Sequence, residues 1–96
     1  MQFLIIAKDG TDKEALDRRM KVRKPHLEGV RKMRAQGEFI EGGAILDDEG
    51  KMIGSCMIVE FYSRETMEAW LRNDPYVTAD VWREINIHPF KVATVN

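Results

Sequence analysis

The chain has 96 residues, a net charge of −1 and a hydrophobic fraction of 44%, values typical of one soluble globular domain over residues 1–96. The N-terminal apolar run is too short for a membrane span and is unlike a signal peptide, so we expect a cytoplasmic protein without membrane contact. The single Cys56 offers no intrachain disulfide, which agrees with a reducing compartment.

Residues 2–8 form a continuous apolar run. Alternate side chains of a strand point to opposite faces, so Phe3 and Ile5 face one side while Leu4 and Ile6 face the other. Because both sides are apolar, we expect this strand to be covered on both faces.

A long helix is predicted after a turn at Asp9 and Gly10. Thr11 and Glu14 have the spacing of a capping box, and Gly37 is placed to end the helix. Apolar side chains at helical spacing predict its buried face: Leu16, Met20, Leu27, Val30 and Met33.

Pro25 interrupts this helical pattern. A proline inside a helix removes one backbone hydrogen bond and clashes with the preceding turn, so we expect a kink or break near residues 22–24. Pro25 would then lie in a new first turn, and His26 would lie near the positive end of a helix.

The central part of the sequence predicts a hairpin. Residues 38–46 are extended, residues 47–50 form the turn, and a return strand follows over about residues 52–62. The return strand carries Cys56 and Ile58 on one face and apolar side chains on the other. We expect it to be a second central strand.

Ser63 is predicted to cap a second helix, and a last strand is predicted over about residues 82–95. Pro89 cannot donate to a sheet ladder, so it interrupts this strand and favours an edge position or a bulge. Three side chains of the second helix are expected to face inward: Met67, Trp70 and Leu71.

Asp74 precedes Pro75, which pushes the Asp74 backbone out of the helical region. Its carboxylate is therefore either an N-cap for the turn that follows or free to face a cavity. The two interpretations are compatible, because an immobile carboxylate is also a good partner for an imidazole, and that imidazole would be His26.

The predicted order is strand, helix, strand, strand, helix, strand. This βαββαβ order predicts an α+β ferredoxin-like sandwich, with one antiparallel four-stranded sheet and both helices on one face. The first and third strands are apolar on the other face as well. We therefore expect a face-to-face homodimer in which a second copy covers that face.

Several phrases of the sequence carry a family resemblance in their order and spacing. They are Arg23-Lys24-Pro25-His26-Leu27, Gly43, Asp47-Asp48-Glu49-Gly50, Gly54-Ser55, Asp74-Pro75-Tyr76 and Ile87-His88-Pro89-Phe90. Nearly the whole chain resembles the YciI-like, or YCII-related, family, although Ala44 stands where that family often has proline. The resemblance implies a dimeric α/β barrel built on the ferredoxin-like fold.

The resemblance also implies that His26 and Asp74 are the active-site pair. A neutral imidazole beside a carboxylate can hold one tautomer and move a proton at about pH 7 without a metal. Related dimeric α/β barrels act on small aromatic compounds and lactones, sometimes with no cofactor. We therefore expect a small-molecule enzyme without a cofactor, with lyase- or isomerase-type chemistry on a small aromatic or organic acid.

The alternative is a non-catalytic small-ligand-binding or dimerisation module, in which His26 and Asp74 form a buried structural hydrogen bond. Arg23 can bind a substrate carboxylate or pair with an acid, and Tyr76 can donate a hydrogen bond or only pack. Ser55 completes the candidate substrate-binding set.

Metal and nucleic-acid sites are not expected. His26, His88 and Cys56 lack the short spacing of metal ligands. The strand at residues 54–61 lacks the stacking aromatics of RNA-recognition domains, and the net charge is slightly negative. The glycines do not form a phosphate-binding loop ahead of a helix.

Overall fold

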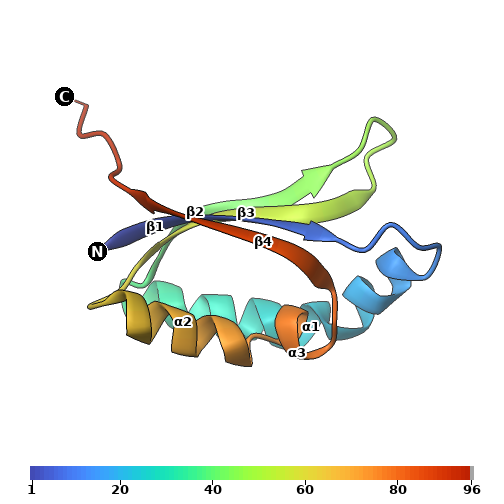
Figure 1. Ribbon diagram of the computed structural model, residues 1–96, viewed down its shortest axis with the longest axis horizontal. Coiled ribbons are helices and arrows are strands. Elements are labelled where there is room, and N and C mark those ends of the chain that lie inside the picture. The colour runs from blue at the N-terminus through green and yellow to red at the C-terminus, as the bar shows by residue number, and fades with distance from the viewer. Residues whose placement is uncertain (96) are drawn as a thin grey trace.

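The computed structural model describes residues 1–95 as one antiparallel sheet with helices packed on one face (Figure 1). The strands are β1 (Gln2–Asp9), β2 (Phe39–Leu46), β3 (Met52–Glu60) and β4 (Trp82–Phe90), and the helices are α1 (Ala15–Ala35), α2 (Arg64–Asn73) and α3 (Pro75–Thr78). The spatial strand order is β2-β3-β1-β4. The predicted ferredoxin-like fold is therefore confirmed, with β1 and β3 as the central strands.

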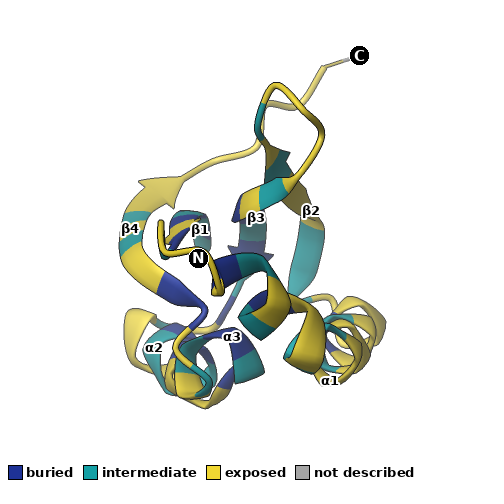
Figure 2. Ribbon diagram, turned by 90° about the vertical axis from the view of Figure 1, so that its right-hand side faces the viewer, coloured by how far each residue is buried: buried dark blue, intermediate teal, exposed yellow. Residues whose placement is uncertain are grey.

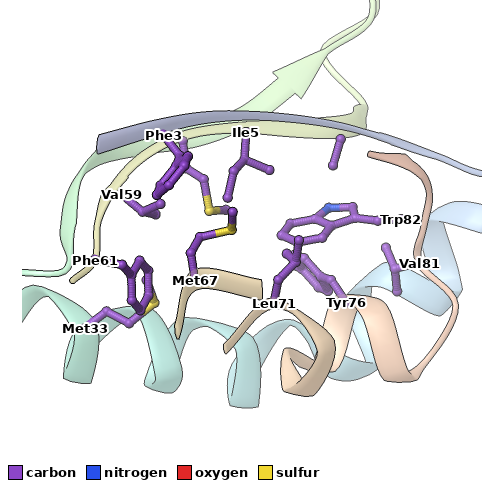
Figure 3. Close-up of a cluster of buried hydrophobic side chains, with 12 residues drawn as sticks. Phe3, Ile5, Met33, Val59, Phe61, Met67, Leu71, Tyr76, Val81 and Trp82 are labelled. Carbon is purple, nitrogen blue, oxygen red and sulfur yellow. The ribbon is translucent and has the colours of Figure 1, made fainter. Parts of the chain in front are cut away.

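The core lies between the sheet and the helices (Figure 2). Alternate residues of β1 and β3 point toward the helices, where α2 and α3 contribute further apolar side chains (Figure 3). The larger members of this cluster are Phe3, Ile5, Met33, Met57, Phe61, Met67, Leu71, Tyr76 and Trp82.

The opposite face of the sheet carries no helix (Figure 1). On its two central strands Leu4 pairs with Ile58, and Ile6 pairs with Cys56. All four side chains are half-buried. The central strands are therefore apolar on both faces, as the sequence predicted.

The start of α1 differs from the prediction. The helix begins at Ala15, and its N-cap residue Glu14 makes no side-chain capping hydrogen bond, so the expected capping box from Thr11 to Glu14 is wrong. The chain is still turning at this point, because the Asp12 carbonyl accepts a hydrogen bond from the Ala15 N–H at 3.1 Å. The Asp12 carboxylate binds Arg18 instead, at 2.9 and 3.0 Å.

Pro25 does not break α1, which is one helix from Ala15 to Ala35 with Pro25 inside it. Of the expected kink or break at residues 22–24, the break is therefore wrong. The proline deprives the Lys21 carbonyl of its helical partner, and both Pro25 and Lys21 are exposed. Water can satisfy that carbonyl, so the cost of the proline is reduced.

The buried face of α1 also differs from the prediction. Its buried residues are Ala15, Arg19, His26 and Met33, whereas Met20 is 50% exposed. The apolar stripe was misplaced because Arg19 and His26 find polar partners on other elements, which lets two polar side chains take core positions. Of the predicted stripe, Leu16, Leu27 and Val30 are also not buried.

Gly37 ends α1 as predicted. It has a φ of 77°, a left-handed conformation that glycine adopts without steric cost. The N–H of Glu38 bonds to the Met33 carbonyl at 2.8 Å and the N–H of Gly37 bonds to the Arg34 carbonyl at 3.2 Å. These two bonds form a Schellman motif.

Two strand ends were overestimated from the sequence. β3 ends at Glu60, and β4 ends at Phe90 rather than near Val95. β4 runs through Pro89 without interruption, and it is an edge strand, where a missing donor is tolerated. None of the helices within residues 1–95 has the length and apolar character needed to cross a membrane.

Candidate functional site

Asp74 connects α2 to α3 and has an extended backbone, with φ −67° and ψ 136°. Its Oδ1 accepts a hydrogen bond from the Tyr76 N–H at 2.8 Å, so Asp74 is the N-cap of α3. The same carboxylate faces His26, whose Nδ1 lies 2.9 Å from Oδ1 and 3.1 Å from Oδ2. Capping and pairing with the imidazole therefore occur together.

His26 lies in the middle of α1 and not near a helix start, because Pro25 does not break the helix. The expected influence of a positive helix end on this ring is therefore wrong, since that field is confined to the first turn. The ring stacks on Tyr76 and meets Trp82 edge-on, with centroid distances of 3.8 and 5.7 Å. With Nδ1 directed at Asp74, Nε2 has no partner within residues 1–95.

A cavity of about 270 Å³ lies beside this pair, between α1 and the β2–β3 side of the sheet. The small residues Gly42, Gly43 and Ala44 form the β2 part of its wall. Four predicted site residues line it: Arg23, His26, Ser55 and Tyr76. Asp74 does not line the cavity, but it contacts His26 through Nδ1.

Positive charge dominates the wall of this cavity. Arg19, Arg23 and Arg34 line it, and no carboxylate of residues 1–95 does. Arg23 and Arg34 form no ion pair within residues 1–95, whereas Arg19 is paired. The cavity is therefore suited to an anionic ligand.

Arg19 belongs to a buried polar network that sequence reasoning missed. Its Nη1 donates to both carboxylate oxygens of Asp9 at 3.0 Å, and its Nη2 donates to Ser55 Oγ at 2.9 Å. Its guanidinium also lies over the ring of Tyr76, 4.7 Å from the centroid. The sequence did contain a sign of this network, because Arg19, Arg23 and His26 have the spacing of one helix face. Apolar periodicity does not detect it, since all three side chains are polar.

Two ionisable groups near the cavity are shifted by burial. Burial raises the pKa of the Asp9 carboxyl above its ordinary value, although hydrogen bonds from Arg19 oppose the shift. Burial likewise raises the pKa of the Tyr76 hydroxyl. The phenol is therefore neutral and able to donate a hydrogen bond at physiological pH.

A larger pocket of about 610 Å³ lies elsewhere, between the loop that follows β1 and the β2–β3 hairpin. Its wall carries three lysines, three aspartates and several apolar side chains, and neither described histidine lines it. The smaller cavity is the candidate site, because the predicted His26 lines it and is held by Asp74. Within residues 1–95, no three His, Cys, Asp or Glu side chains are grouped in a way that could hold a metal ion.

The fold and the site define a ferredoxin-like protein with a ligand-sized cavity under its sheet. A dimeric ferredoxin-like protein from an uncultured marine organism shares this fold, with a TM-score of 0.53 and 11% identity over 100% of both chains. The chain belongs to the YCII-related domain family, whose model matches residues 1–91. The predicted family is confirmed. Protein YciI of Escherichia coli O6:H1 is 34% identical over 97 residues, covering 95% of this chain and 97% of the relative.

One similar structure belongs to an enzyme. The 5-chloro-2-hydroxyhydroquinone dehydrochlorinase of Burkholderia phenoliruptrix AC1100, in complex with 2,5-dihydroxybenzoquinone, has a TM-score of 0.83 and 26% identity. The similarity covers 97% of this chain and 96% of the dehydrochlorinase. The likeness to a small-molecule enzyme therefore extends over the whole fold.

Proposed function

We propose that this protein is a small-molecule enzyme in which His26, oriented by Asp74, transfers a proton. The observation that carries the proposal is that the two nitrogens of the imidazole ring differ: Nδ1 is hydrogen-bonded to Asp74, whereas Nε2 has no partner within residues 1–95. Asp74 lies 2.9 Å from Nδ1, and His26 borders the cavity. In the neutral ring the proton is held at Nδ1 by the carboxylate, so Nε2 is left as a base facing a ligand.

The proposed step is a proton transfer at a small acidic centre. Nε2 takes a proton from a carbon next to a carbonyl group, or from a hydroxyl group, and the electron pair of the broken bond stays on the ligand as an enolate or oxyanion. The imidazolium that forms is stabilised by Asp74. The proton then returns to a different ligand atom in an isomerisation, or a leaving group departs with its electron pair in an elimination.

The proposed ligand is a small anionic aromatic compound or organic acid. Arg23 and Arg34 supply positive charge that no lining carboxylate neutralises, and Tyr76 supplies an aromatic surface with a hydroxyl donor. The name of the similar dehydrochlorinase describes the loss of a proton and a chloride from a hydroxylated ring. A base at Nε2 would remove the proton in such an elimination.

A ligand screen followed by kinetics tests the proposal. Organic acids, phenols and 2,5-dihydroxybenzoquinone, the molecule in the dehydrochlorinase complex, would be screened by thermal shift, and the binding compounds and their precursors assayed for turnover. We expect His26→Ala to lower kcat by about 10²- to 10⁴-fold with little change in binding. His88→Ala is the matched histidine control, because His88 lies on the opposite face of the sheet, paired with Leu4. That face is also the proposed dimer interface, so the assembly of this variant would be checked by light scattering.

Two results would contradict this proposal, the first its catalysis and the second its ligand class. Binding without turnover of any bound compound, and with equal affinity in His26→Ala, would support the alternative of a non-catalytic ligand-binding module. Failure of every organic acid, phenol and quinone to bind would contradict the proposed ligand class. With the first result, the pair of His26 and Asp74 would be a structural hydrogen bond.

The proposed assembly is a homodimer joined through the open face of the sheet. Leu4, Ile6, Cys56 and Ile58 form an apolar strip there that no helix of the chain covers. Light scattering should show a dimer for the wild type and a monomer for Ile58→Asp. Lys21→Asp, on an exposed side of α1, should leave the dimer intact, and a monomeric wild type would contradict this assembly.

A further inference from the structure

The hydroxyl oxygen of Ser55 is surrounded by groups that only donate hydrogen bonds. Arg19 Nη2 donates to Ser55 Oγ at 2.9 Å, and Trp82 Nε1 donates to the same oxygen at 3.2 Å. Neither a guanidinium nor an indole carries an acceptor. Since a serine oxygen has two lone pairs and both are used, the only bonding capacity left to Ser55 is its own O–H.

No acceptor for this proton lies within residues 1–95. Ser55 is 3% exposed, so the proton has little access to bulk water, yet the side chain lines the cavity beside His26 and Tyr76. A buried polar group without a partner is costly. The cavity is therefore the place where an acceptor for Ser55 is to be sought.

We propose that Ser55 donates its hydroxyl proton to an acceptor-only oxygen of the ligand, and that Arg19 is the positioning residue that enforces this direction. The inference rests on the proposed function, because it places the ligand in the cavity beside His26. The ligand group is a phenolate, an enolate or a carboxylate oxygen. A neutral hydroxyl would have to send its proton elsewhere, and an ammonium group has no acceptor to offer Ser55.

Arg19 is held firmly enough for this task. Both oxygens of Asp9 accept from its Nη1 at 3.0 Å, and its guanidinium lies against the ring of Tyr76. Its Nε–H is buried and has no partner within residues 1–95. The pair with Asp9 therefore leaves one donor of the guanidinium unsatisfied. The hydrogen bond from Nη2 to Ser55 Oγ polarises the Ser55 hydroxyl and makes it a better donor.

This arrangement matches the charge that the proposed proton transfer creates. When His26 Nε2 removes a proton, negative charge develops on a ligand oxygen in the same cavity. A fixed donor aimed at that oxygen stabilises the product of the transfer more than the neutral ligand. Ser55 would thus contact the ligand directly, and Arg19 would act on the ligand only by orienting the Ser55 hydroxyl.

A pair of matched probes tests the direction of this hydrogen bond. para-Nitrophenol ionises to a coloured phenolate, whereas para-nitroanisole has the same ring and cannot ionise. Binding of both would be measured by calorimetry over a pH series, with visible absorbance reporting the ionisation of bound para-nitrophenol. We expect wild-type protein to prefer the phenolate, and Ser55→Ala to weaken phenolate binding by about tenfold or more. Binding of the anisole should fall much less, because its ether oxygen is a weaker, uncharged acceptor.

Three further variants make the test specific. Ser55→Thr keeps the hydroxyl and should retain phenolate binding within about threefold. Thr78→Ala removes an exposed hydroxyl outside the cavity and should change nothing. Trp82→Phe returns one lone pair to Ser55, so the preference for phenolate over neutral phenol should fall. Because Trp82→Phe retains Ser55, it also provides the test if Ser55→Ala fails to fold.

The outcomes separate this inference from the function on which it rests. Equal phenolate binding in wild type and Ser55→Ala, or an unchanged preference in Trp82→Phe, overturns the role of Ser55 alone. If the wild type binds neither probe, the proposed ligand class fails, and the inference fails with it. If Ser55→Ala and Trp82→Phe lose phenolate preference while His26→Ala keeps it, the donor role stands independently of proton transfer.

Discussion

The imidazole of His26 lies against the phenol ring of Tyr76, with 3.8 Å between the ring centroids and 14° between their planes. The Tyr76 hydroxyl makes no hydrogen bond within residues 1–95, although the residue is only 1% exposed. Burial raises the pKa of this hydroxyl, so it remains a neutral donor. The ring of Tyr76 therefore supports His26, while its hydroxyl is available to a ligand.

Tyr76→Phe should separate these two roles. The ring contact with His26 is retained, so the free energy of unfolding should change by less than about 1 kcal/mol, whereas affinity for an anionic ligand should fall by about 3- to 10-fold. Urea denaturation and calorimetric titration measure the two effects. As a control, Tyr76→Ala should lose about 3–5 kcal/mol of stability by opening the core. A large loss of stability in Tyr76→Phe would show that the hydroxyl has a structural partner.

Gly42 is required where β2 passes close to β3. A Cβ at this position would lie 2.7 Å from the Cys56 carbonyl oxygen and 2.8 Å from Met57 Cβ. Gly42→Ala should therefore lower the free energy of unfolding by about 1–3 kcal/mol, as measured by urea denaturation. Gly43→Ala is the matched control, since a Cβ at Gly43 meets nothing within 4 Å in the chain. Equal losses in the two variants would show that the close approach is not the cause.

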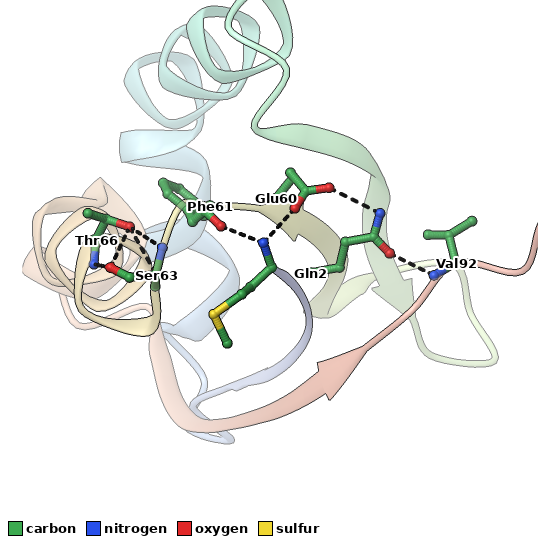
Figure 4. A network of polar contacts seen from close by, with 7 residues as sticks. Gln2, Glu60, Phe61, Ser63, Thr66 and Val92 are labelled. Atoms are coloured by element: carbon green, nitrogen blue, oxygen red, sulfur yellow. Dashed lines mark hydrogen bonds and ion pairs between the residues drawn. The ribbon is translucent and has the colours of Figure 1, made fainter.

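Glu60 joins the chain start to the end of β3 (Figure 4). The N-terminal ammonium of Met1 donates to Glu60 Oε2 at 2.7 Å, and Gln2 Nε2 donates to Oε1 at 3.2 Å. The ammonium is the main reason that the pKa of Glu60 lies below its ordinary value, with Gln2 adding to the shift. A carboxyl with a lowered pKa in the folded state stabilises the fold above its unfolded pKa, and this contribution is lost as the pH falls through the folded pKa.

Glu60→Gln should therefore be less stable than wild type at neutral pH, and the difference should shrink as the pH falls below about 4.5, the ordinary value for this group. Thermal unfolding over a pH series measures it. Glu28→Gln removes an exposed carboxylate of α1 and should show no such pH-dependent difference. A difference between wild type and Glu60→Gln that persists at strongly acid pH would point to packing instead of charge.

The fold was predictable because its main signals are local. Two-sided apolar strands, the turn at Asp47–Gly50 and the caps at Ser63 and Gly37 each depend on a few neighbouring residues, and all are present in the structure. The helix at Pro25 was mispredicted because the cost of a proline depends on whether the freed carbonyl reaches water. That exposure is set by tertiary packing, which the sequence does not show locally.

The site was predictable in part. The proximity of His26 and Asp74 was expected from a motif and a family resemblance, and the two side chains are hydrogen-bonded. The network of Asp9, Arg19 and Trp82 was not expected, because charged and indole side chains enter a core only where distant residues satisfy them. These hydrogen-bond partners lie on separate helices and strands, so no local sequence pattern predicts them.

At Asp74 a single substitution can separate the capping of α3 from the orientation of His26. Its Oδ1 serves both His26 Nδ1, at 2.9 Å, and the Tyr76 N–H, at 2.8 Å, while Oδ2 lies 3.1 Å from the same imidazole nitrogen. In Asp74→Asn the amide oxygen can keep the cap, but the amide nitrogen takes the place of Oδ2 and brings a second donor toward Nδ1–H. The ring avoids this clash by moving its proton to Nε2, which then cannot act as a base.

We therefore expect Asp74→Asn to fold and to bind ligand within about threefold of wild type, because an asparagine caps α3 as well as an aspartate does. Proton transfer should fall by about 10²- to 10⁴-fold, since the base is lost while the cavity is intact. NMR of the His26 ring nitrogens should show the proton on Nδ1 in the wild type and on Nε2 in the variant. An unchanged tautomer together with unchanged turnover would remove Asp74 from the proposed mechanism and leave it as a helix cap.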